Sequence, residues 1–289
     1  MNAPRAMGFM AVFAATWAAV EVLAARALTV YSPFQVVFTR YVVHLVVLFA
    51  LAGRTDPAGL VRTKRLAYQI GRSLLMLGMP ACFVFAFRSG VDPRTASAIF
   101  WLSPLFIVAF GALVLRERPA PSALAATLAA TAGAVLFSGF GPWPGLRLLV
   151  LPLGMAGTFS LYVAMTRGLR DEDTRTNLFY TAAGVALALA PFMPRVWVTP
   201  TLGDFAVMCG VGSLGLLGLY ALDRATHLAP VAVTAPVVCV QLPLNLLLQC
   251  VVGRAALRRR DLAGTAVVLA ALLFVWLRER RRAVEPARA

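Results

Sequence analysis

Apolar residues fill most of the chain in ten long runs, and polar residues concentrate in the short connectors between them. Most runs are about 17–22 residues long, and a helix of that length, at ~1.5 Å per residue, crosses a ~30 Å hydrocarbon layer. The pattern predicts ten transmembrane helices. The expected spans are Ala6–Ala27, Pro33–Leu51, Leu66–Phe87, Thr95–Leu115, Ser122–Ser138, Leu148–Thr166, Thr176–Phe192, Phe205–Ala221, Val231–Val252 and Leu262–Leu277.

The composition supports an integral membrane protein. Hydrophobic residues make up 60% of the 289 residues, charged residues only 13%, and the mean hydropathy is +0.80. Too little polar surface remains for a water-soluble domain of this size. The first run differs from a cleaved secretory signal because it is longer than a signal core and contains Trp17 and Glu21. We therefore expect an all-α fold that lies in the membrane.

The basic residues predict the orientation of the chain. The net charge of +15 is scattered over connectors, which favours contacts with anionic lipid headgroups over nucleic-acid binding. Sixteen of the 27 Lys and Arg residues fall on the side of the termini and nine on the other, while Arg40 and Arg72 lie within spans. The excess places both termini in the cytoplasm. Four arginines before the last span oppose this assignment.

Two parts of the chain, 137–139 residues apart, show the same order of features. In each, a connector ending in proline leads into a span with a proline near its middle, Pro104 in the first part and Pro243 in the second. Chance similarity between Ala/Leu-rich helices is the alternative, but the recurring proline favours duplication. We expect two five-helix repeats, 1–141 and 142–289. Because five crossings are an odd number, the second repeat would be inverted, as in secondary carriers with a site between repeats.

Two opposite charges are expected at similar depth in the first two spans. A charge inside a span costs about 2.5–3.5 kcal/mol on insertion scales, so it normally faces protein or water. Glu21 and Arg40 each lie about 9–10 Å below the same face by helical rise. A static buried ion pair is favoured over a proton-responsive or gating pair, and Arg40 could instead extend outward to the interface. His44, one turn beyond Arg40, is interpreted as a hydrogen-bonded core histidine rather than a titrating group.

Further polar and aromatic residues define a candidate pathway. Pro104 and Pro243 free backbone carbonyls in mid-span, which favours bends beside a cavity over bends tolerated by packing. Gln241 and Asn245 lie on one helix face, where they would bind an amino or carboxyl group or only join neighbouring helices. Aromatic side chains away from the headgroup region are suited to a pocket for an apolar ring, although ordinary packing is the commoner role. The remaining candidates are Trp17, Phe83, Ser97, Trp101, Ser160, Tyr162 and Tyr220.

The sequence contains no motif for catalysis, ATP or a metal. The four cysteines have neither ligand nor redox spacing, and they are interpreted as core residues. A GxGxxG match at residues 210–215 lies inside an apolar span with no preceding strand, so it is not a dinucleotide site. We expect neither a cofactor nor enzymatic activity. The expected partners are a small-molecule substrate and membrane lipid, with the chain a monomer or weak dimer.

The stretch from Phe85 to Ser138 resembles the drug/metabolite transporter superfamily, specifically its EamA-type ten-helix carriers. It combines an aromatic and alanine run, the segment Thr95-Ala96-Ser97-Ala98, a mid-helix Leu-Ser-Pro and Arg116-Glu117-Arg118-Pro119 before a small-residue helix. The second repeat departs from this pattern, since residues 254–260 include no glutamate. Within the superfamily, the chain looks most like bacterial exporters of aromatic and other neutral amino acids.

The resemblance implies a secondary transporter in the bacterial inner membrane that exports amino acids by alternating access. Carriage of a different class (drug-like, nucleotide-sugar or purine) or import is the alternative. A membrane-embedded enzyme would need His, Asp or Glu clustered at one depth. A scaffold would need longer loops or tails. Both rivals fit the sequence less well.

Overall fold

The computed structural model describes residues 2–53, 56–253 and 257–284. Ten helices within these residues are long and apolar enough to span a membrane, so the predicted fold class is confirmed. The longer helices are α1 (Ala3–Ala27), α2 (Pro33–Leu48), α4 (Leu66–Arg88), α5 (Pro93–Phe100), α6 (Ser103–Leu115), α7 (Pro121–Ser138), α8 (Val150–Gly168), α9 (Thr174–Leu189), α11 (Leu202–Leu228), α13 (Gln241–Val251) and α14 (Arg259–Val284). The short α3 (Pro57–Val61), α10 (Met193–Val196) and α12 (Val231–Thr234) complete the α-helices.

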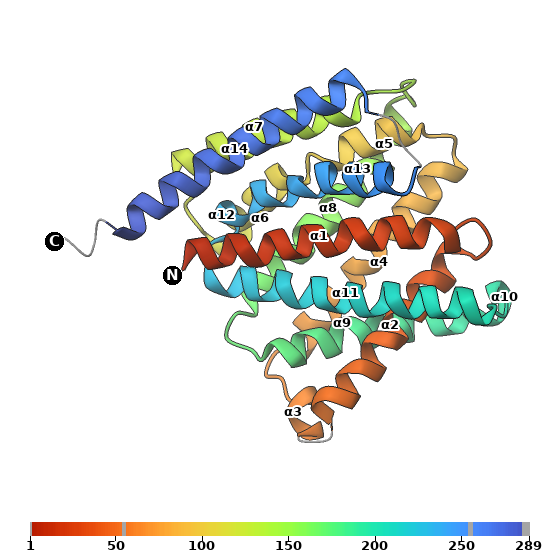
Figure 1. The fold of residues 1–289 in the computed structure, drawn as a ribbon. Helices are drawn as coiled ribbons and strands as arrows, with labels where there is room; N and C mark the ends of the chain where they lie inside the picture. Colours follow the sequence, from red (N-terminus) through yellow and green to blue (C-terminus); the bar gives the residue numbers. More distant parts are fainter. Residues whose placement is uncertain (1, 54–55, 254–256, 285–289) are drawn as a thin grey trace.

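The two predicted repeats interleave in one bundle (Figure 1). Helix α1 packs along α11, and its counterpart in the second repeat, α8, packs along α4 in the same way. Helices α2 and α9 pack together, as do α7 and α14, and each pair joins corresponding spans. This exchange of partners agrees with two inverted repeats. The boundary between residues 141 and 142 stays a prediction.

The fourth and ninth spans are both interrupted. In the fourth, α5 ends at Phe100 and α6 begins at Ser103, one residue before Pro104. In the ninth, a 3-10 segment, Ala235–Val240, separates α12 from α13, which has Pro243 in its first turn. A proline ring clashes with the preceding helical turn and lacks an N–H, so a continuous α-helix is disfavoured here. The backbone carbonyl of Ser103, beside the interruption, accepts a hydrogen bond from the Ser160 hydroxyl (2.9 Å).

Several helices extend beyond their predicted ends. The predicted eighth span stops at Ala221, but α11 continues to Leu228 and includes Asp223. It can do so because Asp223 accepts hydrogen bonds from Thr174 and Asn177 of α9 inside the protein. The last span, predicted as Leu262–Leu277, runs from Arg259 to Val284. Charged residues end a hydropathy window but not a helix, provided that the protein or water solvates them.

The N-terminal end of α1 and the C-terminal end of α14 lie at the same end of the bundle (Figure 1). We call this end the terminal face and the other end the opposite face. Their assignment to cytoplasm and periplasm stays a prediction from the charge count. Three arginines in that count, Arg54, Arg254 and Arg288, lie outside the described residues.

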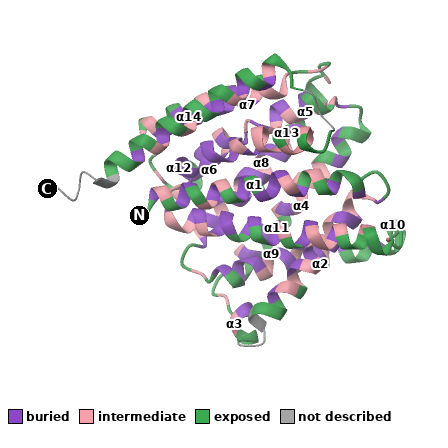
Figure 2. Ribbon diagram, in the orientation of Figure 1, coloured by how far each residue is buried: buried purple, intermediate pink, exposed green. Residues whose placement is uncertain are grey.

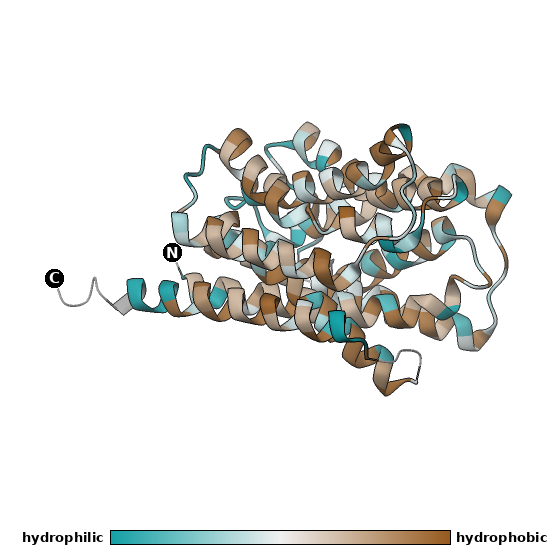
Figure 3. Cartoon of the chain, turned by 90° about the horizontal axis from the view of Figure 1, so that it is seen from above, coloured by the Kyte–Doolittle hydropathy of each residue, from teal (hydrophilic) through white to brown (hydrophobic). Residues whose placement is uncertain are grey.

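Burial separates a protein core from a lipid-facing surface. Buried residues concentrate on the central helices α1, α8 and α11, while α14 is largely exposed (Figure 2). Exposed leucines such as Leu113 (77%) and Leu273 (56%) suit contact with lipid tails. Hydrophobic residues run along the lengths of the helices, and the C-terminal end of α14 is hydrophilic (Figure 3).

Helices α7 and α14 approach closely at two glycines, and this contact predicts a stability effect. A Cβ on Gly264 would lie 2.6 Å from the carbonyl oxygen of Gly133. We therefore expect Gly264→Ala to destabilise the fold by about 1–3 kcal/mol, the usual cost of overpacking. Gly210→Ala is the matched control because a Cβ there meets nothing within 4 Å. Thermal unfolding in detergent measures both, and equal midpoints would contradict the close packing of α7 on α14.

Candidate functional site

Two adjoining cavities open toward the opposite face. The larger has a volume of about 390 Å³ and the smaller about 340 Å³, both within the range of about 300–1,000 Å³ usual for small-molecule sites. Pro93 lines the larger cavity, and Leu28 and Pro33 line the smaller; all three lie at helix ends on the opposite face. Three residues line both cavities: Glu21, Met79 and Phe83. The cavities therefore form one candidate binding region.

Glu21 of α1 is held by two amides of α13. Its carboxylate accepts hydrogen bonds from Gln241 (2.8 Å) and Asn245 (2.5 Å), and Gln249 in turn donates to Asn245. The glutamate is nevertheless exposed, because it faces the cavities. Glu21 and its two amides lie in different predicted repeats, so the candidate site is built at their interface.

Arg40 does not form the predicted ion pair with Glu21. Within the described residues no ion pair joins it to Glu21. The guanidinium carbon instead lies 5.1 Å from the centre of the Trp17 ring and 4.7 Å from that of Tyr41. Counting residues places both charges near one face but cannot show that α13 supplies amides to the glutamate and that aromatic rings lie beside the arginine. Arg40, Trp17 and Glu21 all line the smaller cavity.

The larger cavity has an aromatic wall. Phe83 of α4 and Phe100 and Trp101, at the break between α5 and α6, line it together with Ser97. The rings of Phe100 and Trp101 meet edge to face with centres 5.4 Å apart. Asp261 of α14 also lines this cavity, but its charge is partly compensated, since Arg260 Nε lies 3.6 Å from its carboxylate. The wall could accept a planar group.

Four predicted pathway residues lie away from the two cavities. His44 is buried, and its ring meets that of Tyr41 edge to face at 4.8 Å. Ser160 is buried against the break between α5 and α6. Tyr162 is buried in a polar cluster, and Tyr220 is 41% exposed and packs against Phe9. Their participation in transport stays a prediction.

A partly buried ion pair joins the two predicted repeats at the terminal face. Arg167 of α8 donates to Glu117, in the connector after α6, with 2.9 Å between Nε of the arginine and Oε1 of the glutamate. Arg167 also donates to the carbonyls of Thr226 and His227 at the end of α11, and Glu117 accepts the backbone N–H of Val231. These contacts join four segments on the terminal face. We call the Glu117–Arg167 pair and these bonds the clasp.

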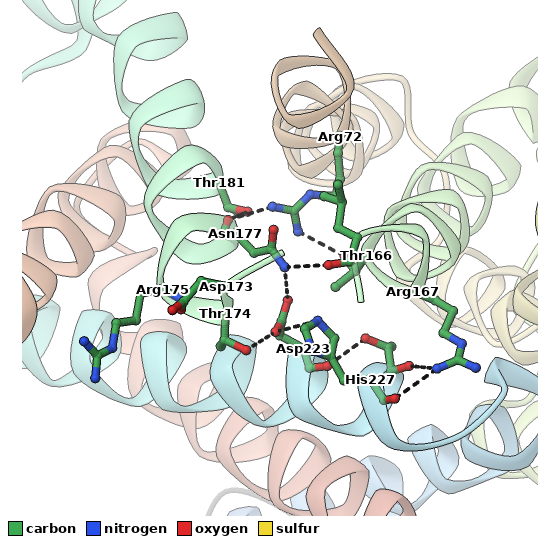
Figure 4. Close-up of polar contacts among 12 residues, drawn as sticks. Arg72, Thr166, Arg167, Asp173, Thr174, Arg175, Asn177, Thr181, Asp223 and His227 are labelled. Carbon is green, nitrogen blue, oxygen red and sulfur yellow. Dashed lines mark hydrogen bonds and ion pairs between the residues drawn. The ribbon is translucent and has the colours of Figure 1, made fainter. Parts of the chain in front are cut away.

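A second buried network lies beside the clasp (Figure 4). Asp223 of α11 accepts hydrogen bonds from Thr174 and Asn177 of α9 and lies 3.2 Å from His227. Arg72 of α4, which is only 1% exposed, donates to the backbone carbonyl of Asn177 at 2.6 Å. The other acceptors of Arg72 are Gln69, Tyr162 and Thr166. The network connects α4 of the first repeat with α8 and α9 of the second.

Sequence reasoning does not identify these buried charges as site residues. Arg72 falls inside a predicted span, and the cost of a charge there is a sufficient reason to expect partners. Asp223 and Arg167 fall in predicted connectors because the predicted spans end before them. Asp261 likewise falls just outside the last predicted span. Pro80 of α4 lines the smaller cavity; it is a mid-span proline like Pro104 and Pro243, but the sequence analysis does not select it because it has no counterpart in the other repeat.

Within the described residues, no group of three His, Cys, Asp or Glu side chains could hold a metal ion. The ten spans define a multi-pass membrane protein, with the two cavities at one end of the bundle and the clasp at the other. Residues 5–139 match the EamA-like transporter family. The matched segment lies within the first predicted repeat, and the wider resemblance to the drug/metabolite transporter superfamily stays an expectation for the rest of the chain.

Relatives with assigned names are transporters. The chain is 23% identical to an S-adenosylmethionine uptake transporter of Rickettsia bellii, with 86% of this chain and 85% of the relative covered. It is 32% identical to a riboflavin transporter of Rhizobium johnstonii over 66% of this chain and 64% of the relative. A crystal structure with 21% sequence identity superposes with a TM-score of 0.81, covering 96% of this chain and 98% of the other. The last likeness shows a shared fold.

Proposed function

We propose that the protein is a secondary transporter that moves a small amphipathic metabolite by alternating access. The observation that supports this most directly is the asymmetry between the two ends of the bundle. Glu21 and aromatic side chains line cavities at the opposite face, whereas at the terminal face the clasp joins the two repeats and the cavity beside it, of about 370 Å³, is lined mostly by charged side chains. Breaking the clasp and closing the cavities would expose the same site to the other side. The interrupted helices α5–α6 and α12–α13 provide places for such a movement.

For the substrate and direction, we propose uptake of a ring-bearing metabolite across the bacterial inner membrane. The named relatives are an uptake transporter and a riboflavin transporter, which supports the alternative of an importer or a different substrate class over the amino-acid exporter. With cytoplasmic termini, the cavities face the periplasm, as the starting state of uptake requires. Export of aromatic amino acids is the second candidate, favoured by the aromatic wall together with the charges of Glu21 and Arg40.

Flux into reconstituted liposomes tests this proposal. We expect time-dependent movement of at least one of labelled S-adenosylmethionine, riboflavin and phenylalanine, and none of a nucleotide sugar. Glu21→Gln removes the charge at the junction of the two cavities and is expected to lower that flux about tenfold, the effect of losing one charge-assisted contact. Arg88→Gln, at the exposed end of α4, is the matched control and should transport normally. Equal flux with and without protein for all ring-bearing solutes would contradict the proposal.

A further inference from the structure

A further cavity, of about 400 Å³, shares no lining residue with the two cavities of the candidate binding region. It lies between α1, α14 and the 3-10 segment Ala235–Val240, and every residue that lines it is apolar. The lining residues fall within 4–11 of α1, 237–240 of the 3-10 segment and 272–276 of α14. We call this cavity the lateral groove.

The lateral groove is open to the surface of the bundle. Gly8 of α1 is exposed, and a Cβ placed on it meets nothing within 4 Å. Leu273 of α14, in the same groove, is 56% exposed. In a membrane, an apolar surface at this position contacts lipid tails. An acyl chain is therefore the apolar group that the surroundings supply to the groove.

One end of the lateral groove carries positive charge. Pro4 lies in the first turn of α1, and Trp276 is the lining residue nearest the C-terminal end of α14, so both lie toward the terminal face (Figure 1). The guanidinium carbon of Arg280 lies 5.1 Å from the centre of the Trp276 ring, which places this charge at the mouth of the groove. Arg5, the residue after Pro4, is also exposed. Among the described residues, neither arginine forms an ion pair with a carboxylate.

This combination of an apolar groove and a free arginine matches an anionic phospholipid. Arginine presents a planar fork of N–H donors that suits phosphate oxygens, and anionic headgroups attract basic residues at the ends of membrane spans. A second copy of the chain is a poorer occupant. A two-fold dimer through the groove would bring the arginines of both copies to the same side of the membrane, where like charges repel.

We infer that the lateral groove binds one anionic phospholipid from the leaflet at the terminal face. Its acyl chain lies between α1 and α14, and its phosphate accepts hydrogen bonds from Arg280, while Arg5 adds positive charge. The acyl chain also contacts Val240, the last residue of the 3-10 segment that interrupts the ninth span. The next residue, Gln241, donates to Glu21. Because a ligand stabilises the state that it binds, the lipid stabilises this arrangement of the ninth span.

Lipid binding to the purified protein tests the headgroup contact. Delipidated protein in detergent is titrated with phosphatidylglycerol or phosphatidylcholine of the same acyl chains, and bound lipids are counted by native mass spectrometry. We expect one phosphatidylglycerol to bind about fivefold or more tightly than phosphatidylcholine. Arg280→Gln should remove most of this preference. Arg278→Gln is the matched control and should keep it, since Arg278 lies over Phe274, two residues from the groove-lining Trp276 and on a different face of α14.

A bulky side chain inside the groove tests the position of the acyl chain. Gly8→Phe should abolish binding of this phosphatidylglycerol, and the protein should still fold because a Cβ at Gly8 has free space. Gly71→Phe, at an exposed position of α4 where a Cβ also meets nothing within 4 Å, is the matched control and should bind as the unaltered protein does. Added phosphatidylglycerol should raise the unfolding midpoint of the control but not of Gly8→Phe.

Several outcomes would overturn the inference. Equal affinity of the unaltered protein for the two lipids excludes an anionic headgroup site, and this comparison needs no variant. An equal loss in Arg280→Gln and Arg278→Gln would indicate diffuse surface charge. Unchanged phosphatidylglycerol binding by folded Gly8→Phe would place the acyl chain elsewhere, and a dimer that dissociates in this variant would make a second copy the occupant. None of these measurements involves flux, so they are independent of the proposed function.

Discussion

Replacing Arg167 with methionine is expected to shift the protein toward a state that is open at the terminal face. The substitution leaves the Glu117 carboxylate without its cationic partner, with a side chain only 14% exposed. Breaking a buried pair from one side costs about 3–5 kcal/mol, and each step of about 1.4 kcal/mol is a tenfold change in population. The clasp belongs to the state that is closed at the terminal face, so its loss destabilises this state relative to the opposite one. We expect the population to shift by a factor of about 100 or more.

The reactivity of a cysteine behind the clasp measures this shift. Ala225 is fully buried on α11, and Ala225→Cys in a background without the four native cysteines should react slowly with a maleimide. Arg167→Met should accelerate the reaction, whereas Arg170→Met, an exposed neighbour, should leave it slow. Adding Glu117→Gln to Arg167→Met removes the stranded charge and should restore part of the protection. Equal protection in all of these variants would show that the clasp does not hold the terminal face closed.

Replacing Arg72 with methionine is expected to cause a large loss of stability, greater than that of Gly264→Ala. The guanidinium is 1% exposed and donates to four acceptors on α4, α8 and α9. Each buried acceptor left without a donor costs about 1–3 kcal/mol, and relaxation reduces the sum. We therefore expect a loss of about 3–5 kcal/mol, less than the full sum for four buried acceptors. Thermal unfolding in detergent gives the comparison.

The control for Arg72 lies on the same helix. Arg88 is exposed at the C-terminal end of α4, so Arg88→Met removes the same charge and adds the same side chain with little effect expected. A fall in the unfolding midpoint for Arg72→Met alone supports a structural role for the network. Similar midpoints for the two variants would mean that Arg72 contributes no more than a surface charge.

The fold can be predicted from the sequence because the spans depend on local information. A hydrophobic run of fixed length predicts a transmembrane helix without reference to the rest of the chain. The bends predicted at Pro104 and Pro243 have a local cause as well, since a missing N–H acts within one turn, but whether the helix is interrupted depends on its surroundings, because α4 continues through Pro80. The ends of α11 and α14 differ from the prediction because their charged residues are solvated by partners or water that hydropathy does not include.

The contacts of the candidate site can be predicted only in part. Depth along a helix follows from counting residues, so the sequence places Glu21 and Arg40 correctly near one face. The direction in which each side chain points depends on neighbouring helices, and Gln241 of α13 lies 220 residues from Glu21 in the sequence. The same limitation applies to the clasp, in which Glu117 and Arg167 meet from different repeats. Such contacts follow from the packing of helices rather than from any local pattern.

Chemical labelling of Ser97→Cys from each side of the membrane tests the central claim most directly. Ser97 lines the larger cavity on the opposite face, and a cysteine-free background isolates it. We expect an impermeant reagent to label it from the side that lacks the termini, with tags on the two ends of the chain reporting that side. A transported solute should slow this labelling by occupying the cavity. Labelling only from the side of the termini, or tags on opposite sides of the membrane, would contradict a site between inverted repeats that opens away from the termini.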